Sequence, residues 1–148
     1  MQTGCRPIRL LMAEDDVEDQ MLMRKAFEAA RVPTHMEVVS DGEELLDCLH
    51  KRGRFTRSHR PDLILLDLNM PRCNGHEALE GIKRDPALRS IPVIVLTTST
   101  REEDIVLSYS RGVSSFISKP ATFDRLIQVA ADVGRYWAET VTLPPNDH

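Results

Sequence analysis

Apolar residues gather in five short runs along the chain, separated by segments in which apolar positions recur at helical spacing. The runs span residues 8–13, 35–40, 62–67, 93–97 and 115–118. Continuous apolar runs of this length are typical of strands that are buried on both faces. Strands that alternate with helices favour a parallel sheet with helices on both sides. The pattern therefore predicts an α/β fold with five strands and five helices.

Residues that begin or end helices indicate the helix boundaries. Asp16 is a suitable N-cap for the first helix, and Pro33 is expected to close that helix. Asp41 and Gly42 predict a turn, after which the apolar positions of residues 45–49 mark the second helix. The other helices are expected at residues 75–84, 102–111 and 123 to about 138.

Length and composition narrow the class of protein. We expect a single domain over residues 1–148, with its core at about 8–138, a C-terminal tail at 139–148 and no effector domain. The net charge of −4 argues against a surface built to bind nucleic acid. No apolar run approaches the roughly 18 residues that a membrane span needs. Three widely spaced cysteines predict reduced thiols and a cytoplasmic location.

Polar residues with chemical potential follow the predicted strands. Glu14 and Asp15 follow the first, Asp67 the third, Thr97 ends the fourth, and Lys119 follows the fifth. Because ligands of parallel sheets gather at the carboxyl ends of the strands, we expect these side chains to converge. Taken singly, most have ordinary explanations as helix-terminal acids, strand residues or surface charges. Asp67 is harder to dismiss, because a charge directly after a buried strand is costly unless it is satisfied.

Together these side chains favour phosphoryl chemistry. Clustered carboxylates repel one another and are stabilised by a cation, and all-oxygen ligands suit Mg²⁺. A carboxylate beside Mg²⁺ can attack a phosphoryl group and form an aspartyl phosphate. Lys119 and Mg²⁺ could neutralise the phosphoryl oxygens, and the Thr97 hydroxyl could donate a hydrogen bond to one of them.

The sequence resembles the receiver domains of two-component response regulators over nearly its whole length, from Ile8 to Trp137. The matching motifs are EDD (14–16), DLNMP (67–71) with Gly75, PVIVLT (92–97) and FISKP (116–120). The resemblance implies a flavodoxin-like, doubly wound five-stranded parallel sheet of order 2-1-3-4-5. A finer similarity, carried by LLMAEDD, LLDLNMP, IPVIVLTTS and the last helix, is to single-domain response regulators associated with phytochrome-type histidine kinases.

The resemblance also implies roles for individual residues. Asp67 would accept the phosphoryl group from a histidine kinase. Lys119 would pair with Asp67 and then with the phosphate. The metal ligands implied for Mg²⁺ are Glu14, Asp15, Asp67 and, through its backbone carbonyl, Asn69.

Further implied roles concern the switch from inactive to active state. Thr97 and Phe116 occupy the two switch positions, and Phe116 stands where many receivers have tyrosine. The Lys119–Pro120 peptide bond is expected to be cis. The protein is expected to be a switch and not an enzyme in the ordinary sense.

Two other functions remain open. An aspartate-nucleophile phosphohydrolase also places its nucleophile after a buried strand, but many such enzymes need a second acid two residues on, where this chain has Asn69. A non-phosphorylated, receiver-like scaffold would need none of the site residues, and the intact set with Asp67 argues against it.

Two surfaces predict contacts with partners. Residues 51–60 (KRGRFTRSHR) carry five Lys or Arg and no acid, so they form either a solvated loop or a docking or stabilising loop for an acidic partner. The last helix has a broad apolar arc, and exposed apolar patches usually mark protein interfaces. We therefore expect a homodimer formed through the last helix and its neighbours.

Overall fold

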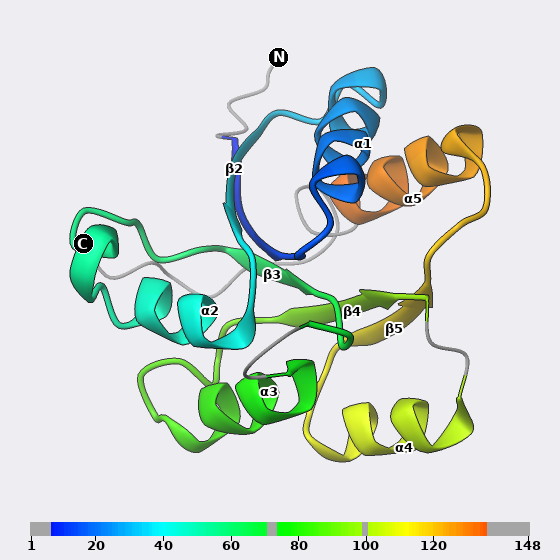
Figure 1. The fold of residues 1–148 in the computed structure, drawn as a ribbon. Helices are drawn as coiled ribbons and strands as arrows, with labels where there is room; N and C mark the ends of the chain where they lie inside the picture. The colour runs from blue at the N-terminus through cyan, green and yellow to red at the C-terminus, as the bar shows by residue number, and fades with distance from the viewer. Residues whose placement is uncertain (1–6, 71–73, 99–100, 136–148) are drawn as a thin grey trace.

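The computed structural model describes residues 7–70, 74–98 and 101–135, and these form a five-stranded parallel sheet (Figure 1). The strand order is β2-β1-β3-β4-β5, so the predicted fold class and strand order are confirmed. The strands are β1 (Ile8–Ala13), β2 (Thr34–Val39), β3 (Leu63–Leu66), β4 (Val93–Thr97) and β5 (Ser115–Ser118).

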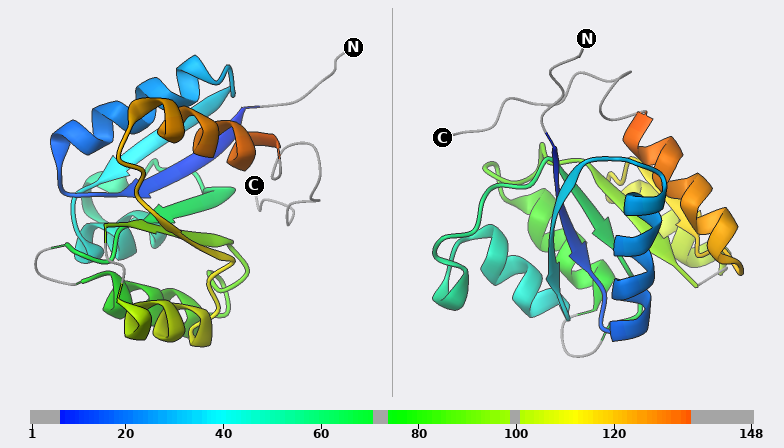
Figure 2. Two further views of the ribbon diagram at one scale, coloured as in Figure 1. Left: turned by 90° about the vertical axis from the view of Figure 1, so that its right-hand side faces the viewer. Right: turned by 90° about the horizontal axis from the view of Figure 1, so that it is seen from above.

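Helices cover both faces of the sheet. The five α-helices are α1 (Val17–Ala29), α2 (Gly42–Leu49), α3 (Gly75–Arg84), α4 (Glu102–Ser110) and α5 (Phe123–Arg135). Figures 1 and 2 show α1 and α5 on one face and α2, α3 and α4 on the other. None of the helices within the described ranges combines the length and apolar character of a membrane span. The expected end of the last helix near residue 138 and the tail at 139–148 lie outside the described residues.

Two hydrophobic cores result from this arrangement, one on each face of the sheet. Successive residues of a strand point to opposite faces. In β3, Leu63 and Leu65 accordingly belong to the core under α1 and α5, whereas Ile64 and Leu66 belong to the core under α2 and α3. All four side chains are buried, which explains why the strand is a continuous apolar run.

The helix caps were partly predicted. Asp16 caps α1, because its Oδ1 accepts hydrogen bonds from the backbone N–H groups of Glu18 (2.9 Å) and Asp19 (3.3 Å). The turn predicted at Asp41 and Gly42 is wrong: α2 begins at Gly42, and Asp41 is its N-cap. An Asp-Gly pair suits both a turn and a helix start, since in each the Asp side chain accepts from a nearby backbone N–H.

The basic segment 51–60 is packed against the domain. It contains a 3₁₀ helix, η1 (Gly53–Phe55), and the Phe55 side chain is only 4% exposed, within the core under α2 and α3. The Arg54 guanidinium lies 4.2 Å from the centre of the Phe55 ring and 3.2 Å from Glu44. Arg60 donates to the carbonyl oxygen of Ala87 at 2.6 Å. The segment is therefore anchored at its middle and at its C-terminal end rather than simply solvated.

Replacing the anchor of this segment should destabilise the whole domain. Because Phe55 is buried, Phe55→Ala should lower the free energy of unfolding by about 3 kcal/mol, as for other large core deletions. The exposed neighbour Arg57 gives a matched control, since Arg57→Ala should change the free energy by no more than about 0.5 kcal/mol. Urea unfolding followed by circular dichroism measures both. Equal, small effects would show that the segment does not contribute to the core.

Candidate functional site

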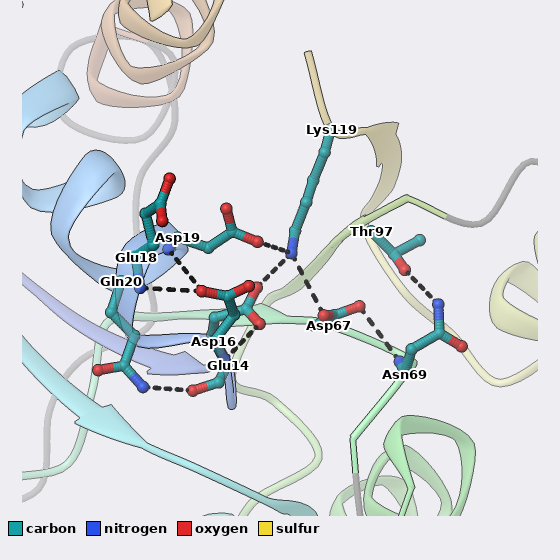
Figure 3. Close-up of polar contacts among 9 residues, drawn as sticks. All are labelled: Glu14, Asp16, Glu18, Asp19, Gln20, Asp67, Asn69, Thr97 and Lys119. Atoms are coloured by element: carbon teal, nitrogen blue, oxygen red, sulfur yellow. Dashed lines mark hydrogen bonds and ion pairs between the residues drawn. The ribbon is translucent and has the colours of Figure 1, made fainter. Parts of the chain in front are cut away.

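The polar residues predicted from the strand ends meet at the carboxyl edge of the sheet (Figure 3). Glu14 follows β1, Asp67 follows β3, Thr97 ends β4 and Lys119 follows β5. Glu14 and Asp67 are buried, with 1% and 6% of their surface exposed, and Asp15 is exposed. Carboxylate oxygens of Glu14, Asp15 and Asp67 lie within 4.8 Å of one another. The predicted convergence is therefore observed.

Lys119 is the cation at the centre of this acidic group. Its Nζ lies 3.0 Å from Asp19 Oδ2 and 3.3 Å from Asp67 Oδ2, and it also forms an ion pair with Glu14 (Figure 3). Burial opposes the charge of this side chain, but hydrogen bonds to Glu14 and Asp19 outweigh burial and raise the pKa of Lys119 above its usual value. The lysine is therefore a permanent positive charge shared among three carboxylates.

Glu14 holds its proton more tightly than an ordinary glutamate. Burial raises the pKa of Glu14 to about 7, although hydrogen bonds from Lys119 and from the backbone N–H of Asp16 (3.1 Å) partly oppose this increase. The backbone is fixed as well, because Gln20 Nε2 donates to the Glu14 carbonyl oxygen at 2.6 Å. The hydrogen bonds from its neighbours therefore compensate only in part for the removal of Glu14 from water.

The loop after β3 fixes the orientation of Asp67. The backbone N–H of Asn69 donates to Asp67 Oδ1 at 3.2 Å, and Asn69 Nδ2 donates to Thr97 Oγ1 at 3.4 Å. Gly75 begins α3 directly behind this loop. A Cβ atom at position 75 would lie 2.5 Å from Leu68 Cα and 2.7 Å from the Asp67 carbonyl oxygen, closer than any real contact. Glycine is therefore needed for α3 to approach the loop that carries Asp67.

The cis bond expected between Lys119 and Pro120 is wrong. No peptide bond in the described ranges is cis, so this bond is trans. The trans form is the lower-energy isomer of an X-Pro bond unless tertiary contacts select the other. Lys119 still reaches Glu14, Asp19 and Asp67, so its inward orientation does not require the cis form.

The switch position Phe116 has a partner that the sequence did not reveal. Phe116 is half-buried against the core under α2 and α3, and its backbone N–H donates to the hydroxyl of Tyr109 at 3.2 Å. Tyr109 is on α4 and half-exposed. The phenol group that position 116 lacks is therefore supplied by Tyr109 on the neighbouring helix α4.

Asp19 and Gln20 were also missed as members of the site. In the sequence, Asp19 looks like an acid that favours the positive end of the helix dipole, because it follows the N-cap of α1 by three residues. No local signal separates that role from contact with Lys119, which is 100 residues away. Only the packing of α1 against α5, the helix that follows Lys119, brings the two together.

The donor set fits a divalent metal ion. Three carboxylates close together, two of them buried, carry more negative charge than one lysine neutralises. Oxygen ligands of this kind are those that hard divalent cations prefer. Glu14, Asp15 and Asp67 are therefore the residues that could hold such an ion.

A doubly wound α/β sheet with an acidic pocket and a lysine at its carboxyl edge is the arrangement expected of a receiver domain. Residues 10–131 match the response regulator receiver domain family, and the chain belongs to this family. Response regulator Rcp1 of Synechocystis sp. is 36% identical over 138 residues, which are 93% of this chain and 94% of that relative.

Solved structures of related proteins share the fold almost completely. The phosphorylated cyanobacterial phytochrome response regulator RcpA has a TM-score of 0.88 and 39% identity, covering 95% of this chain and 100% of RcpA. The Mn²⁺-bound form of Rcp1 has a TM-score of 0.86 and 36% identity, covering 94% of this chain and 100% of that structure. The protein is a two-component response regulator similar to these single-domain proteins.

The raised pKa of Glu14 predicts that metal binding depends on pH. In the metal-free protein Glu14 keeps its proton up to about pH 7, and a metal ion must displace that proton. The affinity for Mg²⁺ should therefore fall about tenfold between pH 8 and pH 6, the range over which one group with this pKa takes up its proton. Isothermal titration calorimetry measures the affinity.

The control is Glu14→Gln, which cannot titrate. This variant should bind Mg²⁺ more weakly and with little change between pH 6 and pH 8. A wild-type affinity that stays constant over this range would contradict the role of Glu14.

Proposed function

We propose that Asp67 accepts a phosphoryl group from a histidine kinase and that the phosphorylated protein signals through protein contacts. The observation that carries this proposal is the position of the Lys119 Nζ, which lies 3.3 Å from Asp67 Oδ2 within a group of carboxylates. A nucleophilic carboxylate beside a fixed ammonium suits transfer of a negatively charged group.

In the proposed transfer, an Asp67 oxygen attacks the phosphorus atom of a phosphohistidine. The new P–O bond forms as the P–N bond breaks, and the imidazole nitrogen keeps the electron pair and takes up a proton. The developing charge lies mainly on the three equatorial phosphoryl oxygens. Lys119 would neutralise one of them, and the Thr97 hydroxyl would donate a hydrogen bond to another.

We further propose that the metal ion of this site is Mg²⁺. The carboxylates of Glu14, Asp15 and Asp67, with the backbone carbonyl of Asn69, would hold it. When bound, Mg²⁺ supplies positive charge beside the phosphoryl oxygens. The hydrogen bond from Asn69 to Asp67 keeps the nucleophile turned toward this group of residues.

The proposed switch couples the site to the surface of α4 and β5. Once phosphorylation draws the Thr97 hydroxyl toward Asp67, the hydrogen bond between Thr97 and Asn69 is lost. Phe116 follows, because it pairs with Val95 on β4, beside the end of the strand that carries Thr97. The hydrogen bond from Phe116 to Tyr109 would carry the change to α4.

The contacts of Asn69 favour this switch over a phosphohydrolase. An amide cannot transfer the proton that a hydrolase requires from its second acid. The Asn69 side chain instead donates to Thr97. We therefore propose a switch and not a multiple-turnover enzyme.

The direct test is intact-mass spectrometry after incubation with Mg²⁺ and a small phosphodonor such as acetyl phosphate. Wild type should gain one phosphoryl group, and Asp67→Asn should gain none, because the amide is a poor nucleophile. Asp16→Asn is a matched control, because Asp16 caps α1 and is not one of the three clustered carboxylates. This variant should be phosphorylated like wild type. Rapid turnover of phosphate esters would favour a hydrolase, and absence of any adduct would favour a scaffold.

We propose a phytochrome-type histidine kinase as the partner and, with it, a cytoplasmic location. The support is the similarity to the phytochrome response regulator RcpA over 95% of this chain. With such a kinase as donor, transfer to Asp67 should differ between red and far-red light. Transfer that is insensitive to light would count against this partner while leaving the phosphoacceptor role intact.

We also propose that the protein forms a homodimer through α4, β5 and α5. The apolar arc of α5 is largely used within the domain, since Ala130 and Val133 are buried in the core shared with α1. Apolar side chains remain exposed nearby: Phe123 on α5 and Val106, Leu107 and Tyr109 on α4. Tyr136 and Trp137, which extend the arc in the sequence, lie outside the described residues.

Size-exclusion chromatography with light scattering tests the dimer. The measured mass should be twice the 16.8 kDa of one chain, and Phe123→Glu should shift the protein toward the monomer, because a charge would enter the apolar contact. Met21→Glu places the same charge at an exposed apolar position on α1 and should leave the dimer intact. A monomer at micromolar concentration, with and without a phosphoryl mimic, would contradict the proposal.

A further inference from the structure

Besides the site at Asp67, the protein has a hollow toward the amino ends of β1 and β2, away from the edge that carries Asp67. Parallel pairing places Arg9 beside His35 and Leu11 beside Glu37. Because alternate residues share a face, all four lie on the side covered by α2, and the segment after η1 closes the space. The hollow has a volume of about 480 Å³, which falls in the range of small-molecule sites.

The lining of this hollow is strongly cationic. Its ionisable side chains are Arg9, Arg54, Arg57, His35, His59 and Glu37. Three guanidiniums against one carboxylate give a local charge of +2 with neutral histidines, in a chain whose net charge is −4. The charge of the hollow is therefore opposite to that of the protein as a whole.

Two of these guanidiniums have charge to offer a ligand. Glu37 accepts a hydrogen bond from the Ser58 hydroxyl at 2.8 Å, and Arg54 is shared with Glu44 outside the hollow. Within the part of the chain that the structure describes, the Arg9 and Arg57 guanidiniums have neither an ion pair nor a hydrogen bond. The one carboxylate of the lining thus already accepts a hydrogen bond, and these two arginines remain available to a ligand.

We propose that this hollow binds a small oligophosphate anion. Guanidinium groups match phosphate oxygens with paired N–H donors, and histidines can add donors of the same kind. The floor is apolar, formed by the buried Leu11 and Pro61, and this low-dielectric material on one side strengthens charge interactions relative to open water. A concave space of this size suits a compact ligand, whereas a protein segment generally needs a longer groove or a broad face.

The test is isothermal titration calorimetry of the full chain with inorganic tripolyphosphate in low-salt buffer without divalent metal. One equivalent should bind. Arg9→Gln and Arg57→Gln should each weaken binding about tenfold, as expected for loss of one charged hydrogen bond. Arg24→Gln removes the same charge from an exposed, unpaired position on α1, in the described part of the chain, and should leave the affinity unchanged. Thermal melts of each variant confirm that it is folded.

Backbone amide shifts locate the bound anion. They should change at residues 35–37 and 57–59 and not at Asp67 or Lys119. Binding about tenfold tighter for ATP than for tripolyphosphate would assign an organic oligophosphate, and equal affinity an inorganic one.

Four results would overturn the proposal. These are no binding at millimolar tripolyphosphate, shifts confined to the Asp67 edge, equal weakening by all three substitutions, and citrate or a glutamate-rich peptide binding more tightly than tripolyphosphate. The last result with the peptide would instead identify the hollow as a docking site for an acidic protein segment. All of these measurements are independent of phosphorylation, so they do not depend on the proposed function of Asp67.

Discussion

The functional site is governed by the repulsion among carboxylates that the fold holds together at one edge of a buried sheet. Glu14 and Asp67 are almost completely removed from water, and Asp15 lies within 4.8 Å of both. Like charges at this separation repel one another, and burial raises the pKa of Glu14 to about 7. A single lysine cannot neutralise this group. The fold therefore maintains a site that is incomplete as protein alone and that favours whatever brings further positive charge.

Backbone contacts make that unfavourable arrangement rigid. Backbone N–H groups of Asp16 and Asn69 donate to the side chains of Glu14 and Asp67, so two of the carboxylates are oriented by main chain. Gly75 lets α3 press against the loop that carries Asp67. These constraints limit the ways in which the carboxylates could turn away from one another. A phosphoryl group or a metal ion would thus meet residues already in position.

The sequence predicted the parts of this arrangement that are local or follow from topology. Continuous apolar runs located the strands, and the order of polar residues after them located Glu14, Asp67 and Lys119 at one edge. Asp19 and Tyr109 could not be predicted, because each acts through a side-chain contact between elements whose relative positions are set only by packing. The same is true of Phe55, an aromatic residue within a charged run. The surrounding arginines suggested exposure to solvent, but the Phe55 side chain is buried in the core.

The placement of Lys119 suggests how the site distinguishes its states. Glu14, Asp19 and Asp67 compete for one ammonium group, and Asp67 is at 3.3 Å from it while Asp19 is at 3.0 Å. A cation beside Glu14 would weaken the attraction between that carboxylate and Lys119, because the cation would neutralise part of the negative charge of Glu14. The lysine would become more available to Asp67 and to a phosphoryl group bound there. Asp19 would limit this effect. It is not one of the three clustered carboxylates, so it would continue to attract Lys119 whether or not the cation is bound.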